Sequence, residues 1–507
     1  MAQSDPARAP KPSRSGYRYP DRAIVIGAGI GGLSMAILLA GLGVRVSVIE
    51  KNAHPGGLTR SYQRKGISCD VGVHYLGSLD RGQILKKFFD FLGVTSAIKV
   101  SRMGECGIVD RYIFTSAQRR EFSFDLPCGF DAFEASLHRA CPGDLSVISS
   151  LMEDIRRAAK RLHNLDLLYD DSNDWALLDQ AEPMGEILDR AACSPELRSI
   201  LAMPANWMGV PLQDCPAYYH NMALASYISS SYRLQGHGAD MVDAFVHRLD
   251  ELGGEIIASQ SVTELLIKDR VVKGVRLSSG ERHAADLVIA AVHPQIVLAM
   301  LPEGAVKPSY RQRISNLVNT HGIFSACATI DSNKHPELPY NLFKVATDRQ
   351  GEVADLRYYQ IRRTGVAGKN LFSLLTSGHD ALWQPWQNTT TGNRGQAYRK
   401  AKNQLAMRLF TEAEEVFGRL SGLELIDAYT PLTLRDWVNT PGGSAYGVQR
   451  SVSQLLATAM LNRTAVKGLY LAGQNVMAPG IIGTIMGSFS TLKLILGPER
   501  FRKQIQL

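Results

Sequence analysis

The apolar and polar positions near the start of the chain predict a strand, a turn, a helix and a second strand. An apolar run from Ala23 to Ile26 ends in a glycine-rich turn, and a longer apolar segment follows from Leu33 to Leu42. A second short apolar run, Val44 to Ile49, ends in Glu50. Short apolar runs bounded by glycines are typical of buried strands, whereas a longer apolar segment favours a helix. The chain therefore begins with a βαβ unit that is followed directly by an acidic residue.

The glycine-rich turn reads GAGIGG from Gly27 to Gly32 and has the chemistry of a dinucleotide site. Gly27 allows the tight turn after the strand, Gly29 leaves room for a pyrophosphate beside the backbone, and Gly32 lets the helix pack closely. The first N–H groups of the helix can then point at the phosphates. Glu50 can accept hydrogen bonds from the hydroxyls of a ribose. Turn, helix and acid together predict a bound dinucleotide.

Two later stretches have the pattern of further strands and helices around the same site. A glycine-containing loop from Tyr232 to Asp240 precedes a segment with helical periodicity, and the following residues, 253–292, predict strands of a small sheet. Near the end of the chain, Gly468 to Asn475 has the pattern of a buried strand that runs into a polar turn. Pro479 to Gly487 opens a final helix, whose N-terminus can also direct N–H groups at a cofactor.

Residues just after the first unit distinguish the kind of dinucleotide. Gly56-Gly57, Arg60-Ser61 and Asp70-Val71-Gly72 resemble the extended N-terminal motif of the FAD-binding family that contains amine oxidases, carotenoid desaturases and Rab GDP-dissociation inhibitors. In that family the double glycine lets the backbone run beside the cofactor. An arginine lies near phosphate or flavin there, and its fixed fork suits phosphate oxygens. The resemblance implies FAD as the cofactor.

Shorter stretches resemble one branch of this family, the phytoene-desaturase-like enzymes, which include carotenoid desaturases and isomerases and retinol saturase. They are Gly72 to Gly77, Thr430 to Thr433 with Gly443 to Gly447, and Gly468 to Gly487. The resemblance implies an FAD-dependent oxidoreductase that acts on carbon–carbon double bonds of a hydrophobic polyene: a carotenoid, a retinoid or a polyketide-derived chain. The expected chemistry is hydride transfer at flavin N5 together with proton transfer. Gln474 departs from the pattern, since related enzymes often carry an acid after the glycine of that strand.

The glycine motif and the resemblance together give the predicted site residues. The proton donor is expected among His74, Tyr75 and Tyr446, because the segment after Gly72 runs toward the flavin in this family and histidine titrates near neutral pH. Arg435 is a weaker candidate. No metal ligands are predicted. The residues expected to contact FAD are Gly27, Gly29, Gly31, Gly32, Glu50, Lys51, Gly57, Leu58, Arg60, His74, Tyr75, Val262, Gly473, Gln474, Gly480, Gly483 and Thr484.

The expected fold class is α/β, with two domains in a chain of 507 residues. A Rossmann-like FAD-binding domain is predicted from three separated segments, residues 21–95, 225–295 and 456–507. An α+β substrate-binding domain, residues 96–224 and 296–455, is expected to be inserted between them, and its apolar and aromatic content suits a hydrophobic pocket. Residues 1–20 are polar, basic and proline-rich, and we predict a disordered tail there.

Composition refines the picture only slightly. The net charge of +8 would suit an anionic membrane surface, and no basic run with interleaved aromatic residues predicts nucleic-acid binding. The seven cysteines are scattered and form no CxxC motif, which argues for a reducing compartment and against zinc. Residues 468–491 carry no charge, but polar residues and a proline interrupt them, so we predict a core segment rather than a membrane span. We expect a cytoplasmic protein with a peripheral membrane contact, and the oligomeric state stays open.

Several other functions could use the same site. A redox-neutral polyene isomerase or a reductive cyclase with reduced FAD is the first alternative. An amine oxidase is less favoured, because residues 468–491 contain no lysine and no clear aromatic cage is visible in the sequence. A binding protein like the Rab GDP-dissociation inhibitors is disfavoured by the intact glycine set. No second GxGxxG with its own βαβ context occurs, so NAD(P)H is expected only as a transient reductant, with quinone or oxygen as other electron partners.

Overall fold

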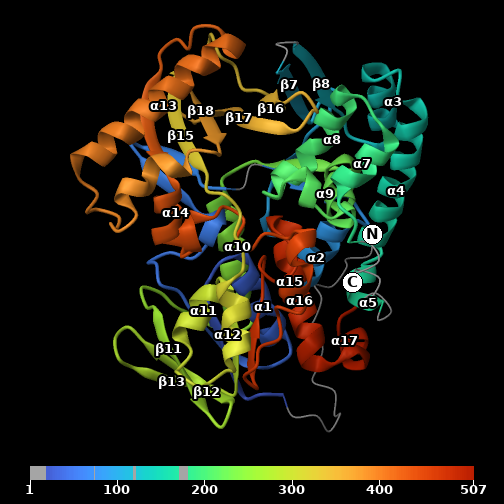
Figure 1. The fold of residues 1–507 in the computed structure, drawn as a ribbon. Coiled ribbons are helices and arrows are strands. Elements are labelled where there is room, and N and C mark those ends of the chain that lie inside the picture. Colours follow the sequence, from blue (N-terminus) through green and yellow to red (C-terminus); the bar gives the residue numbers. More distant parts are fainter. Residues whose placement is uncertain (1–18, 73–74, 118–120, 171–180) are drawn as a thin grey trace, which may run out of the picture.

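The structure is a computed structural model that describes residues 19–72, 75–117, 121–170 and 181–507. The tail predicted over residues 1–20 lies outside this range except for its last two residues. Figure 1 shows a broad sheet across the top of the molecule, with α13 (Gly395–Phe417) on one side of it and a group of helices that includes α3, α4, α8 and α9 on the other. A second group of strands and helices, which includes α1, α11, α12 and α16, lies beneath.

A parallel sheet of five strands forms the base of the lower part. The strand order is β10-β2-β1-β14-β20, and every neighbouring pair is parallel. These strands come from three distant parts of the chain, which confirms the predicted α/β fold with a Rossmann-like domain of three segments. The strands are β1 (Arg22–Ile26), β2 (Arg45–Ile49), β10 (Glu255–Ile257), β14 (Leu287–Ala290) and β20 (Leu469–Leu471).

The small sheet predicted between residues 253 and 292 is narrower than expected. Only β11 (Val262–Lys268), β12 (Val271–Leu277) and β13 (Arg282–Ala284) form it, as an antiparallel meander. β10 and β14 instead join the parallel sheet. The physical reason is burial: every residue of β14 is apolar and buried, so this strand needs cover on both faces.

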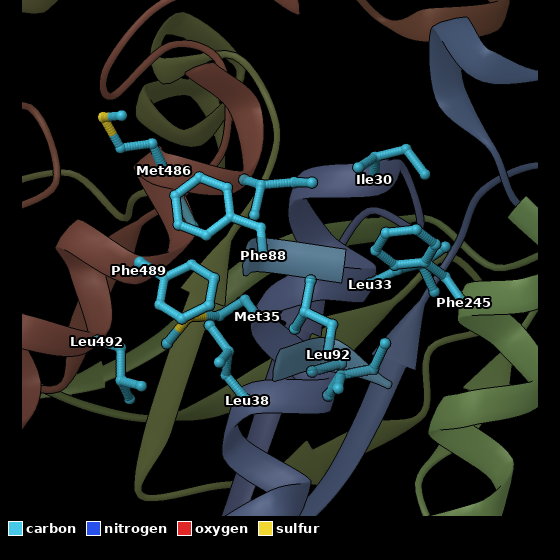
Figure 2. Close-up of a cluster of buried hydrophobic side chains, with 14 of the residues drawn as sticks. Ile30, Leu33, Met35, Leu38, Phe88, Leu92, Phe245, Met486, Phe489 and Leu492 are labelled. Carbon is cyan, nitrogen blue, oxygen red and sulfur yellow. The ribbon is translucent and has the colours of Figure 1, made fainter. Parts of the chain in front are cut away.

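Helix α1 (Ile30–Gly41) is the centre of the largest hydrophobic core. It packs against α16 (Gly480–Leu496) and α10 (Gly238–Glu251). Figure 2 shows Phe489 and Leu492 of α16 on one side of α1 and Phe245 of α10 on the other. Phe88 of α2 (Ile84–Leu92) stacks on Phe489 with 4.8 Å between ring centroids. The first and last segments of the chain are therefore joined by buried apolar contacts, as a single cofactor domain requires.

The sheet in the upper part has seven strands in the order β19-β15-β18-β17-β16-β7-β8. It is antiparallel except where β16 and β7 run parallel. Residues of α13 share a core with its central strands, and helices α3, α4, α7, α8 and α9 share a core with β7, β8 and β16. The strands are β7 (Asp110–Ser116), β8 (Glu121–Leu126), β15 (Phe324–Asp331), β16 (Asn341–Thr347), β17 (Val353–Arg363), β18 (Lys369–Thr376) and β19 (Glu424–Tyr429).

Short elements connect the two sheets. α11 (Pro294–Met300) and α12 (Pro308–Ser315) share a core with β1, β14 and the small sheet. α11 spans the predicted boundary between residues 295 and 296, and α12 follows it, so the domain boundaries stay a prediction. The other strands are β3 (Ser61–Arg64), β4 (Ile67–Asp70), β5 (Leu76–Gly77), β6 (Val100–Arg102) and β9 (Ser231–Leu234). The other helices are α3 (Phe130–Ala140), α4 (Leu145–His163), α5 (Asp166–Tyr169), α7 (Met184–Ala191), α8 (Pro195–Trp207), α9 (Ala217–Ser229), α14 (Pro431–Val438), α15 (Leu455–Thr458) and α17 (Pro498–Gln504).

The uncharged stretch near the C-terminus contains β20 and most of α16. Among the described residues, no single helix has both the length and the apolar character needed to cross a bilayer. Only α16 joined to α17 meets that standard, and the two are bent by 120° at their junction.

Candidate functional site

One cavity of about 480 Å³ lies at the carboxyl edge of the parallel sheet and extends to the seven-stranded sheet. Parallel strands bring the residues that follow them to the same edge, which is where ligands bind in such sheets. The turn after β1, the acid after β2 and the turn after β20 all meet there. The predicted residues that line it are Gly27, Gly29, Gly31, Glu50, Lys51, Gly57, Leu58, Tyr75, Val262, Tyr446, Gly473, Gln474, Gly480, Gly483 and Thr484.

The glycine turn has the geometry that its sequence predicts. Gly27 adopts φ +97°, and its N–H donates to the carbonyl oxygen of Ile49 at 2.8 Å. A Cβ on Gly32 would lie 1.9 Å from the Gly27 oxygen, so Gly32 serves helix packing and does not line the cavity. A Cβ on Gly29 would meet only the Cα of Gly57, at 3.9 Å. The cavity side of Gly29 is therefore open to a ligand.

The N-terminus of α1 is suited to an anion. Its N-cap, Gly29, offers no side-chain hydrogen bond, and the first turn of the helix carries no acidic residue. Its first N–H groups are therefore not capped by a side chain, and Gly29, Ile30 and Gly31 line the cavity. Such N–H groups, together with the helix dipole, bind phosphate groups. This region fits the pyrophosphate of FAD.

Glu50 holds the position expected for a ribose-binding acid. Its carboxylate is buried and accepts the N–H of Ala28 at 2.9 Å and the N–H of Asn52 at 2.9 Å. The side-chain amide of Asn52 donates to the same oxygen, Oε1, at 2.8 Å. These donors fix the carboxylate at the end of β2, where it lines the cavity. Val262, at the start of β11, lines the same cavity.

Two partly buried cations lie close to the predicted cofactor residues. Burial lowers the pKa of Lys51, whose ammonium donates to the carbonyl oxygen of Asp436. Burial also lowers the pKa of Arg60, which is not among the residues that line the cavity, so its contact with FAD stays a prediction. The Nε of Arg60 donates to the carbonyl oxygen of Gly57 at 3.0 Å, which holds the guanidinium beside the Gly56-Gly57 pair. Its buried Nη2 has no hydrogen-bond partner among the described residues, so the structure offers one further donor near an anionic cofactor.

The last cofactor segment meets the first through glycines. A Cβ on Gly31 would lie 2.7 Å from the Cα of Gly473, and a Cβ on Gly487 would lie 2.3 Å from the Gly473 oxygen. α16 begins at Gly480 without a side-chain cap, and Gly480 lines the cavity. Two helix N-termini therefore face one cavity, which adds to the fit with FAD.

The structure describes two of the three predicted proton donors. His74 lies outside the described residues. Tyr75 and Tyr446 both line the cavity, and burial raises the pKa of each phenol, to about 12 for Tyr446. The Tyr75 hydroxyl donates to Oδ2 of Asp110 at 3.2 Å. Arg435 is not among the lining residues, and it pairs with Asp436 at 2.8 Å instead.

Sequence reasoning missed the aromatic wall of the cavity. The rings of Tyr75 and Tyr227 are 4.6 Å apart, and those of Tyr227 and Trp207 are 5.2 Å apart. Phe343 and Tyr358 add to the wall from β16 and β17. These residues are far apart in the sequence, so no pattern could group them.

Asp110 is the second residue that the sequence did not indicate. It is 0% exposed at the start of β7, just behind the aromatic wall. Oδ2 accepts the hydroxyls of Tyr75 and Tyr112, each at 3.2 Å, and Oδ1 accepts the amide of Asn341 at 2.8 Å. Burial raises the pKa of Asp110 to about 6. A single aspartate at the start of a strand does not indicate in the sequence that its carboxyl group will be buried or that its pKa will be raised.

Three curated relatives resemble the chain over most of their length. The all-trans-retinol 13,14-reductase of Macaca fascicularis is 22% identical over 96% of this chain and 87% of its own. Prolycopene isomerase 1 of an Oncidium hybrid cultivar is 24% identical over 92% and 82%. The 4,4'-diapophytoene desaturase of a Methylomonas species is 22% identical over 94% and 96%.

A solved structure supports the fold, and a family model gives the cofactor class. An oxidoreductase from Methanosarcina mazei superposes with a TM-score of 0.65 over 93% of this chain and 100% of its own, at 16% identity. The model of the flavin-containing amine oxidoreductases matches residues 30–488, which include helix α1 from its first residue, Glu50 and the C-terminal segment that lines the cavity. The chain therefore belongs to the flavin-containing amine oxidoreductase family and is an FAD-dependent oxidoreductase.

Proposed function

We propose that the protein transfers a hydride between FAD and a carbon–carbon double bond of a hydrophobic polyene, with transfer of a proton to or from the neighbouring carbon. When bound, FAD supplies the two-electron chemistry at N5. The named activities of the three relatives, a retinol reductase, a prolycopene isomerase and a diapophytoene desaturase, support a polyene as the substrate class.

The observation that carries the proposal is the character of the cavity beyond the cofactor residues. Apolar and aromatic side chains of both domains line it there, among them Trp207, Tyr227, Phe343 and Leu375. The only carboxylate among the described lining residues is Glu50, at the nucleotide end. A cationic amine would need an anionic partner when it leaves water, whereas a neutral polyene needs only apolar surface. The wall therefore suits a polyene better than an amine.

Three outcomes of one assay separate reduction, desaturation and isomerisation. The flavin-loaded protein is titrated anaerobically with NADPH while the oxidised-flavin band is followed, and all-trans-retinol or a linear carotene is then added. We expect the band to bleach and the product to gain a pair of hydrogens. A product that loses hydrogens with oxidised flavin would mean a desaturase, and unchanged mass with an altered retention time would mean an isomerase. Turnover of primary amines but of no polyene would overturn the proposal.

We also propose a peripheral contact with membranes, which would let an insoluble polyene reach the cavity. Leu456 and Met460 are 76% and 61% exposed, and Val318 is 56% exposed. Val318 lies beside them, because its backbone N–H donates to the side-chain oxygen of Gln454 at 3.0 Å. Arg313 donates to the carbonyl oxygen of Ala457 at 3.1 Å and so places a cation at this surface. Exposed apolar side chains beside cations suit an anionic bilayer.

Flotation with vesicles tests this contact. The wild-type protein is expected to float with vesicles that contain phosphatidylserine, and the double variant Leu456→Asp/Met460→Asp to lose at least about tenfold in bound fraction, because each buried apolar side chain contributes about 1–3 kcal/mol. Met407→Asp, at a position 43% exposed on α13, is the matched control and should float like the wild type. Equal flotation of all three proteins would refute this surface.

A cytoplasmic location is a proposal as well. It is supported by the seven cysteines, all of which are free thiols in the structure, as a reducing compartment would keep them.

A further inference from the structure

A buried polar network lies between the aromatic wall and the seven-stranded sheet. Asp110 and Asn341 face each other in register on β7 and β16, and the Asn341 amide donates to the Asp110 carboxylate. The side-chain oxygen of Asn341, Oδ1, accepts the Tyr358 hydroxyl at 3.0 Å and a guanidinium N–H of Arg233 at 3.2 Å. Asp110, Asn341 and Arg233 are all buried, so this network is held in one arrangement.

The network reaches the cavity at two phenols. Tyr75 and Tyr358 line the cavity, whereas Tyr112, which bonds to the same Asp110 oxygen at the same 3.2 Å, does not. Tyr75 therefore has one side toward the cavity and the other toward a carboxyl group that is sealed from solvent. A hydroxyl between a buried acid and a reaction cavity can pass a proton in either direction.

We propose that Asp110 and Tyr75 form a proton relay that serves the carbon next to the one that exchanges a hydride with FAD. The proposal rests on the proposed function and adds the route of the proton. Tyr75 is the group that touches the substrate, and Asp110 is a positioning residue that orients the Tyr75 hydroxyl and replaces its proton.

The step balances with a reduced nicotinamide as the electron source. In the reducing direction the double bond gains a hydride at one carbon and a proton at its neighbour. The Tyr75 O–H bond breaks as that proton leaves, and the carboxyl proton of Asp110 moves to the Tyr75 oxygen. Between turnovers, water in the emptied cavity gives a proton to the Tyr75 oxygen, and Tyr75 passes its own proton back to the Asp110 carboxylate. In the oxidising direction the same groups would run in reverse: Tyr75 takes the proton from carbon and passes its own to the Asp110 carboxylate, and the hydride from the adjacent carbon would go to the bound flavin.

The groups around Asp110 give the relay a defined pH dependence. The protonated carboxyl is the donor, and it is present below the pKa of about 6 and lost as pH rises through it. Reduction is therefore expected to slow above pH 6, whereas desaturation would speed up. Burial sets the raised pKa, and hydrogen bonds and the positive charge of Arg233 oppose it. The titratable groups that face Asp110 are Tyr75, Tyr112, Tyr227, Tyr358 and Arg233, with Arg362 and Asp70 beyond Tyr358.

Phenylalanine variants of Tyr75 and Tyr112, together with Asp110→Asn, test the relay in the flavin-loaded enzyme. Tyr75→Phe and Asp110→Asn are each expected to lower kcat about a hundredfold, the usual contribution of a positioned acid or base. Asp110→Asn should also abolish the dependence of kcat on pH near 6. The double variant should be no slower than the slower single variant, because both groups act in one path. Tyr112→Phe removes an equal hydrogen bond to Asp110 outside the cavity, and should keep kcat within about threefold.

Equal losses in Tyr75→Phe and Tyr112→Phe would show that the hydroxyls only support the fold, and would overturn the relay. Infrared pH-difference spectra of the flavin-loaded protein give a readout without turnover. A carboxylic acid band that titrates near pH 6, vanishes in Asp110→Asn and shifts in Tyr75→Phe supports the relay. Its absence from the wild type overturns it. A wild type that converts no polyene overturns the proposed function, and the infrared titration still decides whether Asp110 carries a proton coupled to Tyr75.

Discussion

Gly29→Glu is expected to purify without flavin. The space beside Gly29 is open, since the nearest heavy atom to an added Cβ is 3.9 Å away, so the variant should fold. Its carboxylate would lie at the uncapped N-terminus of α1, where we place the pyrophosphate. Two anions cannot share these N–H groups, and we expect FAD to bind at least about a hundredfold more weakly, a loss of about 2.7 kcal/mol. The flavin-to-protein absorbance ratio of the purified protein measures this.

Gly41→Glu is the matched control for that variant. Gly41 ends the same helix, and an added Cβ there meets no atom within 4 Å. This protein should keep its flavin at the wild-type ratio. Full flavin occupancy in Gly29→Glu would show that the pyrophosphate does not lie beside Gly29.

Gly487→Ala is expected to unfold more easily and to hold flavin weakly. An added Cβ would lie 2.3 Å from the oxygen of Gly473, and both residues belong to packed backbone that cannot turn aside as a side chain can. α16 must then move away from the turn after β20, which lines the cavity. We expect a loss of about 1–3 kcal/mol in the free energy of unfolding, the usual effect of overpacking. Urea unfolding and the flavin ratio test both parts.

Gly41→Ala shows what the same change does without a clash. Alanine stabilises a helix relative to glycine by up to about 1 kcal/mol, so this variant should be as stable as the wild type or more so. If Gly487→Ala were likewise stabilised, the close approach of α16 to Gly473 would not exist in solution.

Local patterns were enough for the cofactor half of the site. The glycine turn, Glu50 and the C-terminal Gly473 segment each follow a strand of one parallel sheet, and parallel strands bring such residues to one edge. The small sheet was predicted too wide, because a short apolar run does not reveal which sheet will bury it. Arg60 was expected to contact FAD, and the structure shows its guanidinium hydrogen-bonded to the carbonyl oxygen of Gly57, outside the lining of the cavity. The arginine side chain is long enough to adopt several conformations, and only its contacts in the folded protein select one of them.

The substrate half could not be derived in this way. Trp207, Tyr227, Phe343 and Tyr358 come from helices and strands that are separated by up to about a third of the chain. Each alone is an ordinary apolar residue, and only the packing of α8 and α9 on β16 and β17 turns them toward one cavity. Asp110 gains its raised pKa from complete burial, which no neighbour in the sequence signals.

The sequence by itself determined the βαβ unit, the dinucleotide turn and the family, because these depend on residue type and spacing within short segments. Only the tertiary structure decided which side chains wall the cavity and that Tyr75 connects it to a sealed carboxyl group. Contacts between distant segments are set by how whole sheets and helices pack. That packing is cooperative over many residues, so no local pattern encodes it.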